Sequence, residues 1–112
     1  MIRDAILALR DDTELDEVLK APQAVIYKHS NRCGISTAAQ LEVRHFAETH
    51  TDVPIYQVDV VAQRPLSRTI ADRLGIRHAS PQVLLVRNGE HVWNTSHFRI
   101  TAHAIEKAVA GI

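Results

Sequence analysis

The chain has little cysteine, no excess of charge and no long hydrophobic run. Its 112 residues include one cysteine, Cys33, so no disulfide can form within the chain and the fold is not held by one. Thirteen basic side chains balance thirteen acidic ones, which gives no electrostatic sign of a nucleic-acid or anionic-membrane partner. The apolar stretch 5–9 is flanked by charges and is too short for a signal-peptide core or a membrane span. We therefore expect a cytoplasmic protein that binds neither nucleic acid nor a membrane.

The size and composition that remain are those of one globular domain. Hydrophobic residues make up 46% of the chain and charged residues 23%, which argues against disorder. No internal repeat, low-complexity tract or linker rich in proline and glycine divides the sequence. We expect residues 1–112 to form a single domain and the protein to be a monomer.

Hydrophobic patterns predict a helix, a strand and a second helix in the first half of the chain. Thr13 is expected to cap a short helix that ends near Lys20. The apolar run Ala24 to Lys28 has the composition of a buried strand. A helix is expected after Cys33, with one apolar face formed by Ile35, Ala39, Val43, Phe46 and Ala47.

The second half of the chain predicts a strand, a helix, a β-hairpin and a last helix. The signals are the strand-like run 53–60, Pro65 at a helix start, Gly75 at its end, the apolar run 82–86, Asn88-Gly89 as a hairpin turn, the returning run 91–93 and Thr101 as a helix cap. In this last helix, Ile105, Ala108, Val109 and Ile112 are expected to face inward.

This order of elements predicts an α/β fold. The strand–helix–strand unit should form a right-handed parallel crossover, and the hairpin should add two antiparallel strands. The expected result is a mixed four-stranded sheet flanked by helices, with an extra helix at the N-terminal side. Cys33 would then follow the carboxyl end of the first strand, where open α/β sheets place their ligand sites.

Cys33 stands at the start of a predicted helix, a position that favours the thiolate. Unpaired backbone N–H groups and the positive end of the helix dipole stabilise a negative sulfur, and Lys28, His29 and Arg32 add positive charge nearby. A free cysteine with a pKa near 8.5 is only about 3% ionised at pH 7, whereas a pKa of about 6 would make it roughly 90% ionised. The pattern predicts a reactive thiol; the alternative is a small buried hydrophobe.

Ser36 occupies the place of the second cysteine in a Cys-x-x-Cys redox motif. Its hydroxyl, three residues beyond Cys33, can hydrogen-bond the thiolate but cannot form a disulfide with it. The chemistry open to such a site is attack on an external disulfide, which gives a mixed disulfide that another thiol must resolve. Cys33 and Ser36 are therefore the candidate catalytic residues.

Other polar residues are expected around the same end of the sheet. Thr95, Ser96 and His97 join the hairpin to the last helix and are expected to form a polar cradle for an acidic small thiol, assisted by helix-start N–H groups. A solvated loop is the alternative for this segment. The seven histidines show no tight ligand spacing, so we expect no metal site. His29 differs from the others because, when protonated, it would favour the thiolate four residues away.

The motifs together resemble those of the monothiol bacilliredoxins, redox proteins of the bacillithiol system. The matching motifs are Lys28-His29-Ser30-x-x-Cys33-x-Ile35-Ser36, Asp59-Val60, Arg64-x-Leu66-Ser67, Ser80-Pro81-Gln82-Val83 and Trp93-x-x-Ser96-His97. The resemblance covers nearly all of the chain after Leu15.

The resemblance implies a thioredoxin-like fold in which Cys33 is the nucleophile. It also implies that the Ser80–Pro81 peptide bond is cis and faces Cys33, and that the Ser80 backbone pairs with a bound thiol or peptide. We place His29, Arg32 and Gly34 among the substrate-contacting residues as well. Such a protein would remove bacillithiol, a cysteine–glucosamine–malate thiol, from oxidised protein cysteines. Bacillithiol and bacillithiolated proteins would be its partners, with bacillithiol as co-substrate and no resident cofactor.

Two other functions remain open on sequence grounds. Cys33-Gly34-Ile35-Ser36 differs by one residue from the Cys-Gly-Phe-Ser pattern of monothiol glutaredoxins, which suggests an iron–sulfur carrier as one alternative. The Gly-Gly element of those glutaredoxins is missing here, where Asn94 to His97 occupy the region. The other alternative is a thioredoxin-fold adaptor without turnover, in which Cys33 is a passive helix cap.

Overall fold

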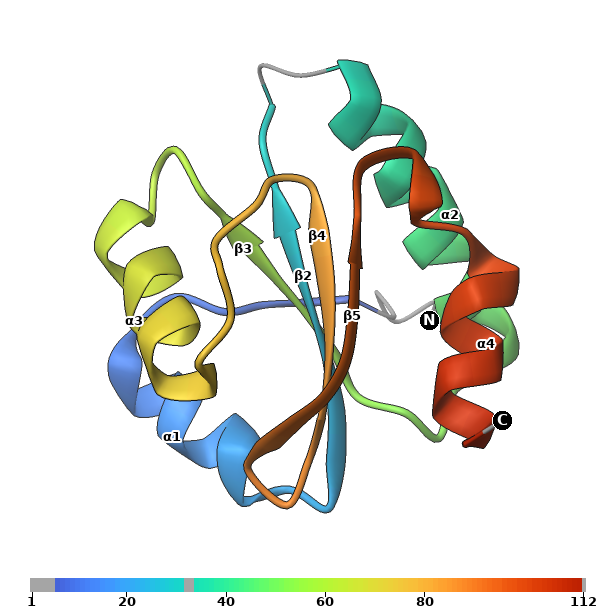
Figure 1. Ribbon diagram of the computed structural model, residues 1–112. Helices are drawn as coiled ribbons and strands as arrows, with labels where there is room; N and C mark the ends of the chain where they lie inside the picture. The colour runs from blue at the N-terminus through green and yellow to red at the C-terminus, as the bar shows by residue number, and fades with distance from the viewer. Residues whose placement is uncertain (1–5, 32–33, 112) are drawn as a thin grey trace, which may run out of the picture.

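A mixed five-stranded sheet lies between two layers of helices in the computed structural model, which describes residues 6–31 and 34–111 (Figure 1). The strands are β1 (Leu7–Ala8), β2 (Gln23–His29), β3 (Ile55–Asp59), β4 (Gln82–Arg87) and β5 (Glu90–Ser96). Their order across the sheet is β1-β3-β2-β4-β5. Strands β1, β3 and β2 run parallel, whereas β4 is antiparallel to both β2 and β5.

The predicted α/β class is confirmed, but the predicted number of strands is one too low. The missed strand is β1, which pairs only with β3 at the edge of the sheet. Two residues are too few to show the alternation of apolar and polar side chains that marks a strand in a sequence.

Four helices and one short 3₁₀ turn complete the chain. They are α1 (Asp12–Lys20), α2 (Gly34–Thr49), α3 (Arg64–Leu74), η1 (His97–Arg99) and α4 (Ala102–Ala110). Helices α1 and α3 cover one face of the sheet, and α2 and α4 cover the other (Figure 1). Among the described residues, no helix is long and apolar enough to cross a membrane.

The helix ends follow the predicted capping chemistry except at α1. Gly75 ends α3 with a left-handed φ of 67°, and the Thr101 hydroxyl caps α4 by accepting from Ala104 N at 3.0 Å. The predicted cap of α1, Thr13, is wrong. Asp11 takes that role, because its side chain accepts from Glu14 N at 2.9 Å and leaves Thr13 inside the helix.

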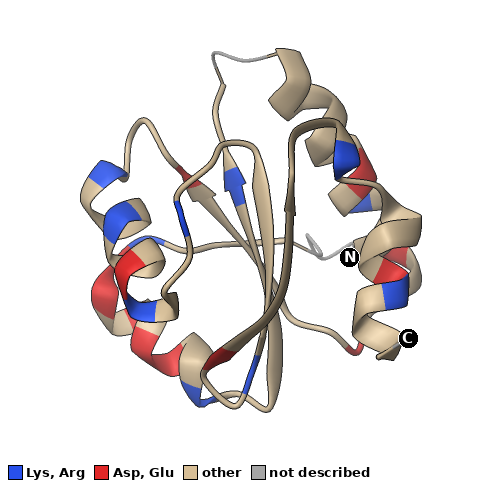
Figure 2. Ribbon diagram, in the orientation of Figure 1, with Lys and Arg blue, Asp and Glu red and all other residues tan. Residues whose placement is uncertain are grey.

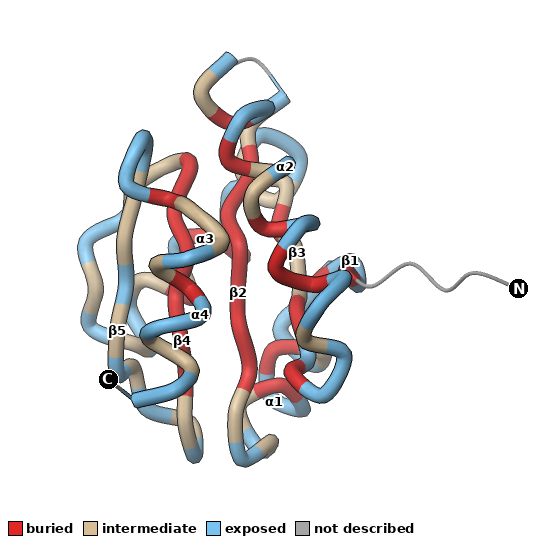
Figure 3. Tube along the Cα trace, turned by 90° about the vertical axis from the view of Figure 1, so that its right-hand side faces the viewer, coloured by how far each residue is buried: buried red, intermediate tan, exposed pale blue. Residues whose placement is uncertain are grey.

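Alternation along the central strand β2 divides the interior into two cores. Ala24 and Ile26 pack with residues of α1 and α3, whereas Val25 and Tyr27 pack with residues of α2 and α4. Figure 3 shows that β2 is buried along nearly its whole length. Trp93 on β5 is half-buried against the α2/α4 core. A buried strand with helices on both faces explains why its sequence is an apolar run rather than an alternating one.

The strand register brings three chain segments to one edge of the sheet. Lys28 pairs with Gln82, and Gln82 pairs with Ser96. His29, Pro81 and His97, the next residues toward that edge, therefore lie in a row across it. His97 N donates to Pro81 O at 3.1 Å, which ties the end of β5 to the start of β4.

Candidate active site

The two residues at the centre of the predicted site, Arg32 and Cys33, lie outside the described residues. Their described neighbours are the end of β2 at His29 and the start of α2 at Gly34. The first turn of α2 contains no acidic residue, so no carboxylate there offsets the positive end of this 16-residue helix. Cys33 therefore stands in the chain between a buried strand and a helix start, as the sequence predicts.

A buried tyrosine joins the end of β2 to the first turn of α2. The Tyr27 hydroxyl lies 2.8 Å from His29 Nδ1 and donates to Ser36 O at 2.9 Å. Tyr27 and Ser36 are completely buried, and His29 is only 5% exposed. The network therefore holds the predicted residues His29 and Ser36 at a fixed separation in a region that excludes water.

The direction of these hydrogen bonds determines the proton position on His29. A carbonyl oxygen only accepts, so the single hydroxyl proton of Tyr27 goes to Ser36 O. His29 Nδ1 must then donate to the Tyr27 oxygen, which makes Nδ1 the protonated nitrogen of the neutral ring. The Nε2 atom of neutral His29 carries the lone pair and can accept a proton.

Ser36 also closes the loop that contains the cysteine. Its Oγ accepts from Ser30 N at 3.3 Å, across six residues of chain. This bond uses a lone pair of the oxygen and leaves the hydroxyl proton available as a donor. The predicted role of Ser36 as a hydrogen-bond donor to the thiolate is compatible with this contact, and the same side chain also shapes the loop.

Ser80 and Pro81 lie on the same sheet edge. Their peptide bond is cis, as the family resemblance implied, and Pro81 is buried. Within the described part of the chain, Ser80 Oγ is buried and has no hydrogen-bond partner. A buried hydroxyl without a partner usually costs stability, and a bound substrate at this edge could supply the missing partner.

The structure corrects the expected cradle at the end of the hairpin. Thr95 and Ser96 belong to β5 because their pairing with β4 continues to Gln82, so they are not loop residues. The helical segment that follows, η1, has three residues, and the N–H of His97 is already used by Pro81 O. The N–H group of His97 is therefore engaged within the sheet edge, and assistance to a ligand stays a prediction only for the later N–H groups of η1. The His97 side chain is exposed, and its φ of 55° is left-handed.

Gly34 is exposed at the start of α2, and a Cβ added there would meet no atom within 4 Å. Its φ is not positive, so neither space nor backbone conformation requires glycine. Open space beside Cys33 in the chain is compatible with the predicted substrate contact.

A buried lysine on the opposite side of β2 was not predicted. Lys28 is completely buried, and its Nζ donates to Ser67 O at 3.0 Å and to His78 Nδ1 at 3.1 Å. None of these partners is a carboxylate, and burial lowers the pKa of Lys28 to about 8. Burial, followed by the charges of Lys28 and Arg68, also lowers the pKa of His78.

Two signals in the sequence could have revealed these groups. Tyr27 and His29 are two residues apart on a strand, so their side chains share one face and can meet. Lys28 interrupts a strand that is otherwise predicted to be buried on both faces. A lysine in such a strand is expected to have hydrogen-bond or charge partners. The identity of those partners, Ser67 and His78, depends on tertiary packing and has no local signal.

Comparison with solved structures places this architecture among thioredoxin folds. A structure described as a candidate oxidoreductase with a thioredoxin fold has a TM-score of 0.87 at 30% identity, and the alignment covers 94% of each chain. A mutant thioredoxin from Halobacterium salinarum NRC-1 has a TM-score of 0.79 at 21% identity, over 99% of this chain and 94% of that one. Thioredoxin from Trypanosoma brucei brucei has a TM-score of 0.81 at 9% identity, over 96% of this chain and 90% of that one. The predicted thioredoxin-like fold is thereby confirmed.

Comparison with protein families gives a narrower result. The match is to BrxC, described as monothiol bacilliredoxin, and it extends over residues 7–105. This region contains every element from β1 to α3, both strands of the hairpin and the start of α4. The chain belongs to the monothiol bacilliredoxin family of thiol redox proteins.

Proposed function

We propose that this protein is a thiol–disulfide oxidoreductase that removes bacillithiol from protein mixed disulfides through Cys33. The observation that carries the proposal is the single cysteine: a member of this thiol redox family has one thiol, in the residue before α2, and no second one to resolve an adduct. A protein of this kind needs a small external thiol to complete its cycle. The family name points to bacillithiol as that thiol.

The reaction consists of two thiol–disulfide exchanges. The Cys33 thiolate attacks the bacillithiol sulfur of a protein–bacillithiol disulfide, forms a new S–S bond and releases the client cysteine as a thiolate that takes up a proton. A second bacillithiol then attacks the adduct on Cys33, which regenerates the Cys33 thiolate and releases oxidised bacillithiol. In the net reaction one free bacillithiol is oxidised and the client cysteine is reduced, and the bacillithiol from the client leaves joined to the second one as a disulfide. Bacillithiol is thus the co-substrate, and the scheme needs no resident cofactor.

The described residues supply supporting groups for this reaction. His29 Nε2 can accept the thiol proton, and the Ser36 hydroxyl proton can be donated to the thiolate. We propose that Ser80 pairs with the incoming disulfide, since its Oγ is buried without a partner among the described residues. Pro81 and His97 adjoin Ser80 on the same edge, and Arg32, Gly34 and Ser96 are the remaining proposed substrate contacts.

Intact-mass measurement tests the proposal directly, because an adduct on this chain can only be on Cys33. Incubation with oxidised bacillithiol, or with a bacillithiolated client, should add one bacillithiol to the wild type and none to the Cys33→Ser variant. Excess reduced bacillithiol should then remove the adduct and produce oxidised bacillithiol.

Two outcomes would count against the proposal. A wild-type protein that reacts with other small disulfides but gains no bacillithiol adduct would refute the assigned substrate. A protein that reacts with no disulfide, and whose thiol alkylation shows a pKa at or above the free-cysteine value, would refute the redox role of Cys33 and favour an adaptor.

A further inference from the structure

A pocket with basic walls opens beside the proposed active site, between the start of α3 and the segment that leads to β4. Its lining residues, which we call the basic pocket, are Val60, Val61, Arg64, Ser67, Arg68 and His78. The pocket has a volume of about 270 Å³. Pockets for whole drug-sized ligands start at about 300 Å³, so this one suits part of a small ligand.

The two arginines of the basic pocket are placed where their charges are unfavourable. Arg64 and Arg68 are four residues apart on one face of α3 and lie in its N-terminal half, near the positive end of the helix dipole. The first turn of α3 has no acidic residue and no side-chain cap. Figure 2 shows basic residues at the upper end of α3, with acidic residues lower down on α3 and on α1. Two like charges four residues apart, and positive charges at the positive end of the helix dipole, both lower stability unless an anion lies nearby.

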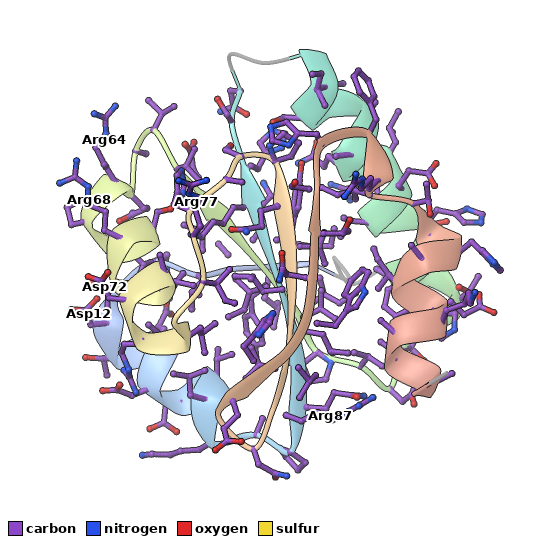
Figure 4. All side chains as sticks on the ribbon, in the orientation of Figure 1. Asp12, Arg64, Arg68, Asp72, Arg77 and Arg87 are labelled. Atoms are coloured by element: carbon purple, nitrogen blue, oxygen red, sulfur yellow. The ribbon has the colours of Figure 1, made fainter. Side chains whose placement is uncertain are left out.

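Among the described residues, several arginines have side-chain partners, whereas Arg64 and Arg68, like Arg77 and Arg99, have none. Arg10 and Arg73 form ion pairs with acidic side chains, and Arg87 donates to the last carbonyls of α4. Within residues 6–31 and 34–111, Arg64 and Arg68 form no side-chain hydrogen bond or ion pair. Figure 4 shows both side chains projecting from the upper turns of α3, with Arg77 on the loop that follows the helix. Their guanidinium groups are available to a ligand.

Asp59, the carboxylate that directly precedes the pocket residues Val60 and Val61 in the chain, accepts hydrogen bonds from other groups. Its Oδ1 accepts from Val61 N at 2.9 Å and from Ala62 N at 3.1 Å, and its Oδ2 accepts from Asn31 at 3.3 Å. No acidic side chain lines the basic pocket as described. None of the residues that line the pocket is therefore a counter-ion for its two arginines.

The back of the basic pocket adds a hydrogen-bond donor and a further charge. Lys28 Nζ donates to His78 Nδ1, so the neutral His78 ring accepts at Nδ1 and carries its proton on Nε2. Ser67 Oγ also lies 3.1 Å from His78 Nδ1, which holds the ring in this orientation. The Nε2–H group is thus left as a donor, with the Lys28 ammonium buried behind it.

One hydrogen bond connects the basic pocket to the proposed active site. Val60 N, in the pocket wall, donates to His29 O at 2.9 Å. His29 precedes Cys33 by four residues, and Lys28 lies between the two sites on β2. The wall of the basic pocket is therefore hydrogen-bonded to the end of β2, the strand that precedes Cys33 in the chain.

We propose that the basic pocket binds the carboxylates at the malate end of bacillithiol while its sulfur reacts with Cys33. This inference rests on the proposed function and adds the basis of substrate choice. Arg64 and Arg68 bind carboxylate oxygens through their planar guanidinium groups, and His78 donates a further hydrogen bond. Selectivity for this thiol comes from its anionic end, and a disulfide without a carboxylate gains nothing from the pocket.

The test compares two disulfides and two double variants. The rate of adduct formation on Cys33 is measured by intact mass with oxidised bacillithiol and with 2-hydroxyethyl disulfide, which carries no charge. Arg64→Gln/Arg68→Gln removes both pocket charges, and Lys20→Gln/Lys107→Gln removes two exposed charges on α1 and α4 as a matched control. Circular dichroism checks that each variant is folded.

We expect the pocket variant to react at least tenfold more slowly with oxidised bacillithiol and less than twofold more slowly with 2-hydroxyethyl disulfide. The control variant should react with both at the wild-type rate. The tenfold difference should shrink as salt is added, because it comes from solvent-accessible charges. Arg64→Lys/Arg68→Lys should recover only part of the rate, since lysine cannot bind a carboxylate in two places.

Several results would overturn the inference. Equal slowing with both disulfides would mean that the arginines act on the thiolate, and equal slowing of the control would mean that only net charge matters. Slowing that appears only with an acidic bacillithiolated client would assign the pocket to side chains of the client. A wild type that takes an adduct from 2-hydroxyethyl disulfide and none from oxidised bacillithiol would refute the proposed function itself, which is visible without any variant.

Discussion

The end of β2 presents two different environments on the two faces of the sheet. On the α2/α4 side, Tyr27, His29 and Ser36 form a buried hydrogen-bond network, in which the described residues include no Asp, Glu, Lys or Arg side chain. On the α1/α3 side, Lys28 is buried and donates to Ser67 and His78 behind a pocket lined by arginines. One face holds a network of hydroxyl and imidazole groups at the end of β2, and the other face holds positive charge.

This difference arises from the alternation of a β-strand. Successive side chains point to opposite faces, so the run Tyr27-Lys28-His29 supplies both environments with no change in backbone course. A three-residue segment therefore presents a tyrosine and a histidine to one face of the sheet and a lysine to the other. Four predictions test whether the environments on the two faces differ in this way.

Lys28→Met should remove the free-energy cost of burying a charged lysine on the α1/α3 side of the sheet. Burial lowers the pKa of Lys28 to about 8 in the folded protein, so between pH 8 and 10.5 the unfolded chain binds more protons at this residue than the folded one. The free energy of unfolding should therefore rise with pH across this window, by about 2–3 kcal/mol. Urea unfolding at several pH values should show this rise in the wild type and a flat profile in Lys28→Met. An equal rise in both proteins would show that Lys28 is not the titrating group.

Tyr27→Phe should break the network on the α2/α4 side. The change leaves Ser36 O and His29 Nδ1 buried without their shared partner, which should lower the free energy of unfolding by about 1–2 kcal/mol. It should also slow adduct formation on Cys33 and shift its pH profile, because the His29 ring loses its fixed tautomer. Tyr56→Phe is the matched control, since no hydrogen bond of its hydroxyl is found within the described residues. If both variants behave alike, the network has no special role.

A pair of serine variants sharpens the contrast between a satisfied hydroxyl and an unsatisfied one. Ser67→Ala removes a hydroxyl that contacts His78 at 3.1 Å and should lower the free energy of unfolding by about 1 kcal/mol. Ser80→Ala removes a buried oxygen with no partner among the described residues and should raise it by about the same amount. Ser80→Ala should nevertheless slow adduct formation, if Ser80 Oγ binds the substrate. Destabilisation by Ser80→Ala would reveal a partner for this hydroxyl in the unliganded protein.

Gly34→Ala should have the smallest effect on stability. The position is helical, its φ is not positive and the added methyl group meets no atom, so the free energy of unfolding should rise by about 0.5 kcal/mol. Thermal denaturation measures this change. A stabilised protein with a slower Cys33 reaction would support Gly34 as a substrate contact, whereas an unchanged rate would remove it from the site.

Most of the fold could be predicted because its signals are local. The apolar run of β2, the Asn88–Gly89 turn with φ values of 52° and 80°, and the left-handed Gly75 all lie in short segments whose chemistry permits few alternatives. The strand β1 and the end of β5 could not be predicted, because both depend on pairing with a strand distant in the sequence. Asp11 and Thr13 are both good caps, and only the tertiary course of the chain decides between them.

The candidate site was predictable as a set of residues and not as a set of contacts. Motif spacing identified His29, Ser36 and Pro81 as candidate site residues, and the sheet register places His29 and Pro81 at one edge. The role of Tyr27 and the pairing of Lys28 with His78 follow from side-chain directions and from packing across 50 residues of chain. The basic pocket has no local sequence signal for the same reason, since α3 and the segment before β4 must fold together to form it.

The position of Trp93 gives the molecule a built-in optical reporter. It is the sole tryptophan of the chain. Its side chain is half-buried and packs against the core that contains Tyr27 and residues of α2 and α4. Its fluorescence spectrum will therefore respond to solvent exposure on that side of the sheet and will be largely insensitive to rearrangements beneath α1 and α3. Its emission at equilibrium and during turnover can thus separate changes on the α2/α4 side of the sheet from changes on the α1/α3 side without any label.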